Sequence, residues 1–304
     1  MRLICKLAAL VVLGSAIFYF WPKEKKTFES KPLLKYSFPT LRETVFLPDG
    51  IWVDKDKFYF WVWGKKVSGK INIPQGQGPF PVVIMIRGYV DREIYRPGIG
   101  TQRAAEVFAQ NGYMTLAPDF LGYGESDMPP NNSLEERFLT PVTILQLIAS
   151  LKNLHQINPD KIYLWAHSNG GQIALSVLEI YGRNFPAVLW APVSKPFPYS
   201  ILYYTDEYED YGKALRKVLA AFDVQYDADE FSVHKFYNWI QAPIQIHQGM
   251  ADELVPLKWS QELEQNLKKA GKEVKLYVYE NADHNLQTGW NLAVERSLNW
   301  FSRH

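Results

Sequence analysis

The chain has 304 residues, 47% of them hydrophobic and 15% aromatic, and its formal net charge at pH 7 is +1. This composition is sufficient for a large core, and a charge so close to zero gives no support to nucleic-acid binding. The length fits either two domains or one large α/β domain. The single cysteine, Cys5, lies near the N-terminus and leaves the remainder of the chain without a disulfide.

Residues 1–26 are expected to form a targeting segment. Arg2 and Lys6 precede an uncharged, apolar run over residues 7–21, which is followed by Pro22 and three lysines. The run continues well beyond the small residues at 14–16, which favours an uncleaved membrane anchor over a cleaved signal peptide. A buried helix is a third reading, disfavoured because the run has no polar face. We expect the domain that follows this segment to be anchored to a membrane or exported, and to lie outside the cytoplasm.

Residues 27–42 are polar, contain two prolines and are interpreted as a linker, so the predicted folded domain spans residues 43–304. Residues 57–63 and 69–73 predict two antiparallel strands at an edge of the sheet. Residues 81–86 form a continuous apolar run rich in β-branched side chains, which is typical of a strand buried on both faces.

From this strand onwards, predicted helices and strands alternate. Helices are expected over residues 100–111, 134–153, 257–270 and 286–301, and strands over residues 113–118, 162–167, 186–190, 243–248 and 274–279. Such alternation predicts an α/β fold in which helices cover both faces of a mostly parallel sheet.

Residues 193–240 interrupt the alternation. The first half of this insertion carries five tyrosines and four acidic residues, namely Tyr199, Tyr203, Tyr204, Tyr208, Tyr211, Asp206, Glu207, Glu209 and Asp210. Connections of this length are usually functional lids, so we predict a helical cap over the site. The alternative is a surface helical hairpin with the tyrosines packed beneath it.

Ser168 lies between a predicted buried strand and an apolar-periodic helix that begins immediately after it. The surrounding residues, Ala166-His167-Ser168-Asn169-Gly170-Gly171, are mostly small. This pattern indicates a nucleophile elbow, in which a strained turn exposes a serine hydroxyl above the sheet. The alternative is that Ser168 simply caps the helix.

Two further strand ends carry residues suited to acyl-transfer chemistry. Asp252 follows the strand at residues 243–248, and His284 follows the strand at residues 274–279. The chain order Ser168, Asp252, His284 is the order in which an α/β hydrolase presents its triad, with each member at the carboxyl end of a strand. Ligands of open α/β sheets bind at that same end.

From about residue 57 to its end the chain resembles the α/β hydrolases, and most closely the dienelactone-hydrolase and prolyl-oligopeptidase branch. Five motifs in the expected order carry the resemblance: Arg87-Gly88-Tyr89, residues 118–127, residues 166–171, residues 249–256 and Ala282-Asp283-His284. Two positions depart from the pattern. Ala166 replaces the usual glycine before the nucleophile, and Asp283 stands where many relatives have glycine.

The resemblance implies a role for each matching residue. Ser168 would be the nucleophile, His284 the general base, and Asp252 the acid that orients the base. The backbone N–H groups of Tyr89 and Asn169 would form the oxyanion hole. Tyr89 would also contact the acyl group.

The cap adds Tyr203 and Tyr204 as candidate substrate-binding residues. Among the competing candidates, His167 is expected to be structural and His247 a core or rim residue. Glu253 is an alternative acid to Asp252. No cluster of histidine, cysteine or carboxylate residues has metal-ligand spacing, so no metal or cofactor is expected.

Three functional readings follow. The favoured reading is a serine hydrolase that cleaves small carboxylic esters through an acyl-enzyme. The second is a peptidase or aminopeptidase of the prolyl-oligopeptidase type, in which the acids of the cap would hold the amine of a short peptide. The third is a membrane-tethered binding protein built on an inactive hydrolase fold, which an intact triad argues against.

Overall fold

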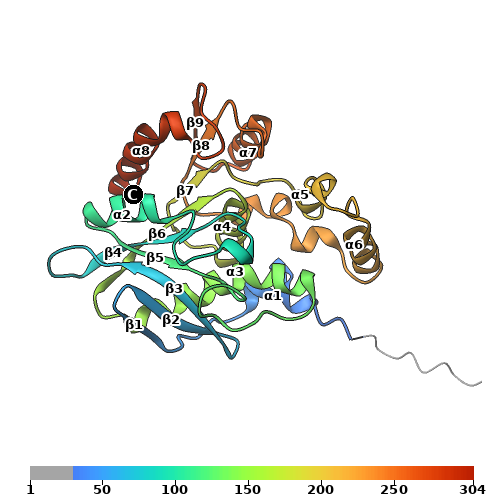
Figure 1. The fold of residues 1–304 in the computed structure, drawn as a ribbon, viewed down its shortest axis with the longest axis horizontal. Coiled ribbons are helices and arrows are strands. Elements are labelled where there is room, and N and C mark those ends of the chain that lie inside the picture. Colours follow the sequence, from blue (N-terminus) through green and yellow to red (C-terminus); the bar gives the residue numbers. More distant parts are fainter. Residues whose placement is uncertain (1–29) are drawn as a thin grey trace, which may run out of the picture. The chain divides into compact units, whose positions relative to one another are not determined.

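A nine-stranded sheet forms the centre of the described part of the chain, residues 30–304, in a computed structural model (Figure 1). The predicted membrane segment, residues 1–26, lies outside the described residues. Within the described range, no helix combines the length and the apolar character needed to cross a membrane.

The strand order of the sheet is β1-β2-β3-β5-β4-β6-β7-β8-β9. The pairs β1–β2, β2–β3 and β3–β5 are antiparallel. The pairs β5–β4, β4–β6, β6–β7, β7–β8 and β8–β9 are parallel. The strands are β1 (Ile51–Asp54), β2 (Lys57–Val62), β3 (Lys65–Asn72), β4 (Phe80–Ile86), β5 (Met114–Pro118), β6 (Ile157–His167), β7 (Ala187–Trp190), β8 (Ile244–Gly249) and β9 (Val274–Tyr279). The predicted α/β-hydrolase architecture is confirmed.

Helices cover both faces of this sheet (Figure 1). The main ones are α2 (Gln102–Gln110), α3 (Ser133–Ser150), α4 (Asn169–Tyr181), α7 (Leu257–Lys269) and α8 (Trp290–Arg303). Alternate residues of β4 divide the core between the two faces. Ile84 packs in the cluster that contains residues of α3, α4 and α7, whereas Met85 packs in the cluster of α2 and α8. Burial on both faces explains the continuous apolar run of this strand.

The insertion between β7 and β8 is helical, as predicted. It contains α5 (Tyr199–Leu202), α6 (Lys213–Gln225) and short 3-10 turns at Thr205–Glu207, Ala228–Phe231, Val233–Lys235 and Tyr237–Trp239. Phe222 and Phe231 of this insertion pack against Phe138 of α3, at ring-centroid distances of 5.7 and 4.7 Å. The insertion is therefore fixed to the main domain through an aromatic cluster.

The predicted linker at residues 27–42 is wrong from Leu33 onwards. This stretch forms a 3-10 turn (Leu34–Tyr36) and helix α1 (Phe38–Glu43), and Ser37 caps the helix by accepting a hydrogen bond from Thr40 N–H. Phe38 and Leu41 are almost fully buried. Burying each such side chain stabilises a fold by roughly 1.5–3 kcal/mol. This stabilisation explains why the segment is folded although its polar composition suggested a linker.

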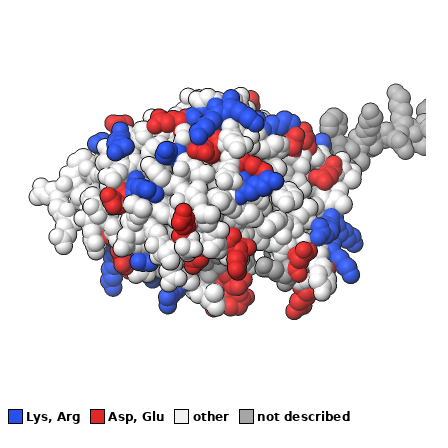
Figure 2. Space-filling view, turned by 90° about the horizontal axis from the view of Figure 1, so that it is seen from above, with Lys and Arg blue, Asp and Glu red and all other residues white. Residues whose placement is uncertain are grey.

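Smaller differences concern element ends. Strand β1 was not predicted, β6 begins at Ile157 rather than at residue 162, and the last helix begins at Trp290 after a 3-10 turn. On the face shown in Figure 2, acidic and basic side chains are interspersed without a large region of one sign. This distribution accords with the net charge near zero.

Candidate active site

Ser168 occupies the turn between β6, which ends at His167, and α4, which begins at Asn169. Its backbone has φ 57° and ψ −124°, a conformation that an L-residue adopts only under strain. Its side chain makes no capping hydrogen bond to the helix. The strained backbone and the absent cap bond favour the elbow over the helix-cap reading.

Close backbone packing explains why glycines follow the serine. A Cβ at Gly170 would lie 2.2 Å from the carbonyl oxygen of Ile86, and one at Gly171 would lie 2.4 Å from Cβ of Pro192. Any larger side chain would push α4 away from the ends of β4 and β7. Ala166, in contrast, is fully buried in the core. Alanine in place of the usual glycine at this position therefore leaves the turn intact.

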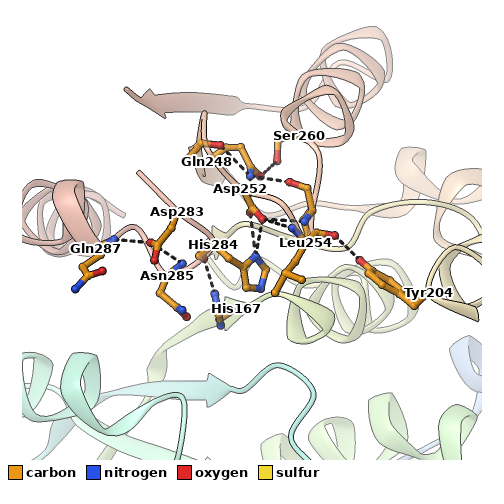
Figure 3. Close-up of polar contacts among 12 residues, drawn as sticks. His167, Tyr204, Gln248, Asp252, Leu254, Ser260, Asp283, His284, Asn285 and Gln287 are labelled. Carbon is orange, nitrogen blue, oxygen red and sulfur yellow. Dashed lines mark hydrogen bonds and ion pairs between the residues drawn. The ribbon is translucent and has the colours of Figure 1, made fainter. Parts of the chain in front are cut away.

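The structure joins Asp252 and His284, which come from the loops after β8 and β9 (Figure 3). His284 Nδ1 lies 2.9 Å from Oδ2 and 3.1 Å from Oδ1 of Asp252. A carboxylate only accepts hydrogen bonds, so Nδ1 is the donor, and in the neutral imidazole Nε2 is then the basic nitrogen. The Asp252 side chain is inaccessible to solvent and that of His284 is 11% exposed.

Three groups besides His284 donate hydrogen bonds to the Asp252 carboxylate. The backbone N–H groups of Leu254 and Val255 donate to Oδ1 at 2.9 and 2.8 Å, and Gln248 Nε2 donates to Oδ2 at 2.8 Å. Gln248 is itself oriented by Ser260, whose hydroxyl donates to Oε1 at 2.7 Å (Figure 3). Burial opposes ionisation of Asp252, but the hydrogen bonds from His284, Val255 and Leu254 outweigh it and lower the pKa of the carboxyl.

Asp283 shapes the loop that carries His284. Its Oδ1 accepts hydrogen bonds from the backbone N–H groups of Asn285 at 3.1 Å and Gln287 at 2.8 Å (Figure 3). The side chain thus closes a local turn, as aspartate commonly does. This contact accounts for an acid at a position where many relatives have glycine.

His167 contacts the same loop from the elbow side. Its Nε2 lies 3.0 Å from the backbone carbonyl oxygen of His284, and the two rings are 4.7 Å apart between centroids. Because a carbonyl only accepts, Nε2 must be the donor. Burial, together with the nearby His284, lowers the pKa of His167 to about 4, so this imidazole is neutral at pH 7.

His247 is a core residue. It is fully buried in β8, with Nδ1 at 2.6 Å from the Tyr279 hydroxyl and Nε2 at 2.7 Å from Gln245 Oε1. Burial, and secondarily the charge of Arg296, lower its pKa to about 3. Glu253 is exposed and has no hydrogen bond to His284, so the geometry gives the acid position to Asp252.

The loop after β4 lies against the elbow. A Cβ at Gly88 would be 2.9 Å from Cβ and 3.4 Å from Oγ of Ser168. Within residues 30–304, neither the N–H of Tyr89 nor that of Asn169 has a hydrogen-bond acceptor. Asn169 also begins α4, where the helix dipole favours negative charge. Two unpaired donors therefore flank the serine.

Ser168 Oγ forms no hydrogen bond to any residue in the described range, His284 included. Serine–base hydrogen bonds are often long until substrate is bound. The structure thus brings Asp252 and His284 into direct contact and places the elbow beside them through His167. No group of three or more potential metal ligands occurs within residues 30–304.

A cavity of about 220 Å³ opens beside the elbow. Gly88, Tyr89 and Asn169 line it on the side of the serine. Aromatic rings supply much of the remaining wall, and they come from α1, α3, the cap and neighbouring loops: Tyr36, Phe38, Phe120, Phe138, Phe197 and Phe231. The N-terminal segment that was expected to be a linker therefore contributes directly to the cavity.

Tyr203 and Tyr204 do not line this cavity. Their rings pack against Trp259 of α7, with centroid distances of 4.7 and 6.4 Å. The Tyr204 hydroxyl donates to the carbonyl oxygen of Leu254 at 3.2 Å, which connects the cap to the loop of Asp252 (Figure 3). Their predicted contact with substrate stays a prediction.

A parallel sheet with a strained serine after β6, and a histidine bound to a buried carboxylate on adjacent loops, defines a serine hydrolase of the α/β-hydrolase class. The model of the prolyl oligopeptidase family matches residues 101–304. The chain therefore belongs to the prolyl oligopeptidase family and is a serine hydrolase, as the sequence motifs indicated.

Individual relatives include both peptidases and esterases. The chain is 25% identical over 248 residues to a Bacillus subtilis protein named uncharacterized peptidase YtmA, an alignment that covers 77% of this chain and 88% of the relative. Among solved structures, Est1E from Butyrivibrio proteoclasticus with bound ferulic acid has 19% identity and a TM-score of 0.63, over 81% of this chain and 98% of Est1E. A puromycin-hydrolyzing peptidase from Mycobacterium tuberculosis has 16% identity and a TM-score of 0.61, over 79% of this chain and 37% of that protein. At these identities the structural similarity concerns the fold.

Proposed function

We propose that the protein hydrolyses small carboxylic esters through an acyl-enzyme formed on Ser168, with His284 as general base and Asp252 as its orienting acid. The observation that carries the proposal is the contact of His284 Nδ1 with a solvent-inaccessible Asp252 carboxylate. In the neutral imidazole this contact places the proton on Nδ1, so that Nε2 can accept the proton of the serine hydroxyl.

The proposed reaction has two halves. Ser168 Oγ attacks the ester carbonyl carbon while its proton passes to His284 Nε2, and the imidazolium then protonates the alcohol as the C–O bond breaks. Water repeats the sequence on the acyl-enzyme, releasing the carboxylic acid and restoring the serine. Asp252 remains ionised throughout, which accords with the lowered pKa of its carboxyl.

The oxyanion of each tetrahedral intermediate would lie between Tyr89 N–H and Asn169 N–H. Both donors lack an acceptor among the described residues and both belong to residues that line the cavity. Preorganised donors of this kind lower a barrier because they need no rearrangement when charge develops. Removal of one such donor typically costs about 100- to 1000-fold in kcat.

The lining of the cavity supports an ester over a peptide amine. The aminopeptidase alternative needs an unpaired carboxylate that faces the site. The acidic residue that lines the cavity, Glu136, is paired with Arg92, and Asp206, Glu209 and Asp210 are exposed and do not line it. Asp210 instead accepts hydrogen bonds from the N–H groups of Gly212 and Ala214, both at 2.8 Å, at the start of α6. Its carboxylate is therefore used to begin a helix.

Family membership is the observation that favours the peptidase alternative. Turnover of p-nitrophenyl butyrate by the full chain in detergent should therefore be compared with that of alanyl and prolyl p-nitroanilides. We expect the ester to be cleaved much faster, with both activities lost in Ser168→Ala. Preferential cleavage of the anilides, lost when Asp206, Glu209 and Asp210 are neutralised together, would replace the esterase by the peptidase. Absence of all turnover would favour the inactive binding protein.

We also propose that residues 1–26 tether the enzyme to a membrane, with the catalytic domain outside the cytoplasm. The support is the apolar run over residues 7–21, bounded by basic residues on both sides. No nucleic-acid partner is proposed.

A further inference from the structure

Arg137 is a cation in the cavity wall that has no anionic partner. It lies in the second turn of α3, and its Nη2 donates to Gln172 Oε1 of α4 at 2.6 Å. No carboxylate of the described residues lies within 4 Å of its guanidinium. Its other side-chain N–H groups have no hydrogen-bond acceptor in the described range, so only part of a five-donor group is satisfied.

Two other charged residues, Arg87 and Glu136, line the cavity, and the buried Nε of Arg87 has no acceptor among the described residues. Arg87 donates to the carbonyl oxygens of Gly88 and Asp119 at 2.9 and 3.0 Å, and its guanidinium lies 4.1 Å from the ring centroid of Tyr123. Glu136 forms an ion pair with Arg92 and is therefore engaged away from Arg137. Neither arginine of the cavity wall forms an ion pair with a described residue, but Arg87 donates to two carbonyl oxygens, whereas Arg137 donates to a single amide oxygen and keeps more donors for a ligand.

The orientation of Arg137 is set by its neighbours. Gln172, its acceptor, donates in turn to Ser200 Oγ at 3.0 Å, and both Gln172 and Ser200 are buried. Burial lowers the pKa of Arg137 to about 10, against smaller opposite effects of Tyr208 and Tyr204, so the group is still a cation at pH 7. Its unused donors belong to a half-buried residue of the cavity wall, where a ligand anion can accept from them.

The geometry also indicates which part of a substrate reaches this cavity. Tyr89 and Asn169, the proposed oxyanion donors, line it, whereas neither Ser168 nor His284 does. The leaving alcohol must lie beside His284 to receive a proton. The acyl group therefore extends in the other direction, past the oxyanion donors and into the cavity.

We infer that Arg137 binds a terminal carboxylate on the acyl group, so that the preferred substrates are monoesters of dicarboxylic acids. This inference rests on the proposed esterase function. A guanidinium binds a carboxylate through two parallel N–H donors, and the apolar wall would hold the methylene chain between the two carboxyl groups. Arg137 is on this view a specificity-determining residue, because it contacts a part of the substrate that does not react.

The test compares charged and neutral acyl groups of equal size. The p-nitrophenyl monoesters of succinate, glutarate and adipate are assayed beside the corresponding monoamides, in which a neutral carboxamide replaces the distal carboxylate. We expect kcat/KM for the best-fitting monoester to exceed that of its amide by about 10- to 100-fold, the range of a charged hydrogen bond. Arg137→Gln should remove this ratio, and Arg137→Lys should retain part of it.

Arg183→Gln is the matched control, because it removes an exposed arginine that does not line the cavity. This variant should keep the wild-type ratio. A ratio near one in the wild-type protein, or a ratio that survives in Arg137→Gln, would overturn the inference. Equal loss of both activities in Arg137→Gln would assign the residue to packing between α3 and α4, and would also overturn it.

A binding measurement separates this inference from the esterase proposal. Calorimetry with Ser168→Ala, which avoids turnover, compares methyl hydrogen glutarate with dimethyl glutarate. Tighter binding of the anionic ester that disappears in Ser168→Ala/Arg137→Gln supports the carboxylate site even if ester turnover is absent. Ester turnover that depends on Ser168 but shows no preference for the anionic ester supports the esterase and refutes the carboxylate site.

Discussion

His167 Nε2 donates a hydrogen bond to the backbone carbonyl of His284, although 117 positions separate the two residues. One residue precedes the proposed nucleophile and the other is the proposed base. The bond therefore connects the elbow to the loop after β9 (Figure 3). The sequence indicated only a structural role for His167, whereas the structure shows which element it positions.

The first prediction concerns this bond. His167→Phe keeps an aromatic ring against His284 but removes the donor, so kcat should fall by about 5- to 10-fold with little change in KM, the effect of one hydrogen bond. His167→Gln retains an N–H donor and should recover part of the loss. Steady-state kinetics on p-nitrophenyl butyrate measures both variants. Full activity in His167→Phe with a loss in His167→Gln would show that the ring is important and the hydrogen bond is not.

The second prediction assigns the acid. Asp252→Asn should lower kcat by on the order of 10⁴, because an amide in place of the carboxylate stabilises the wrong histidine tautomer. Glu253→Gln, at the exposed neighbouring position, should have little effect. Thermal denaturation of both variants provides the folding control. The assignment to Asp252 is contradicted if the two kinetic effects are reversed.

The third prediction concerns stability against pH. The folded-state pKa of His247, about 3, is below the ordinary value of 6.5, so between these values the unfolded chain binds a proton that the folded protein does not. The free energy of unfolding should therefore fall as the pH decreases from about 6.5 towards 3, by about 1.4 kcal/mol for each pH unit. His247→Gln should be less stable at pH 7, because it disturbs the bonds to Tyr279 and Gln245.

Urea unfolding at pH 7 and pH 5 measures this effect. The wild-type midpoint should decrease more between the two pH values than that of His247→Gln. Identical decreases in both proteins would show that the buried imidazole does not govern acid sensitivity.

The fourth prediction separates the N-terminal segment from catalysis. Residues from Pro32 onwards form one compact unit and contain the whole proposed site, so removal of residues 1–26 should give an active enzyme in the soluble fraction. The full chain should partition with membranes. Recovery of the full chain, with its N-terminus intact, in a soluble fraction would contradict the proposed tether. Deletion to residue 42 serves as a contrast and should destabilise the protein, since it removes buried Phe38 and Leu41.

Much of the fold and the proposed triad could be predicted because the signals are local. The continuous apolar run of β4 indicates burial on both faces, and Ser168, Asp252 and His284 each follow a strand in the order typical of the fold. The small residues around Ser168 reflect backbone contacts at Gly170 and Gly171 that no larger side chain permits.

Other features depend on contacts between distant segments and leave no periodic pattern. Helix α1 is stable because Phe38 and Leu41 fill a space formed by other elements, which the polar composition of residues 27–42 conceals. Gln248 supports Asp252 only because the loop after β8 folds back to it. Tyr203 of the cap packs on Trp259 of α7, a contact that the sequence does not reveal. The cavity wall is built by the cap phenylalanines, with those of α1 and α3.

The central claim is that Ser168 is the nucleophile, and its most direct test is covalent labelling. The full chain is treated with a fluorophosphonate, which phosphonylates an activated serine, and the modified peptide is identified by mass spectrometry. We predict a single adduct on Ser168, no adduct in Ser168→Ala, and strongly reduced labelling in a His284→Ala variant that lacks the base. Equal labelling of wild type and Ser168→Ala, or an adduct on another residue, would contradict the account.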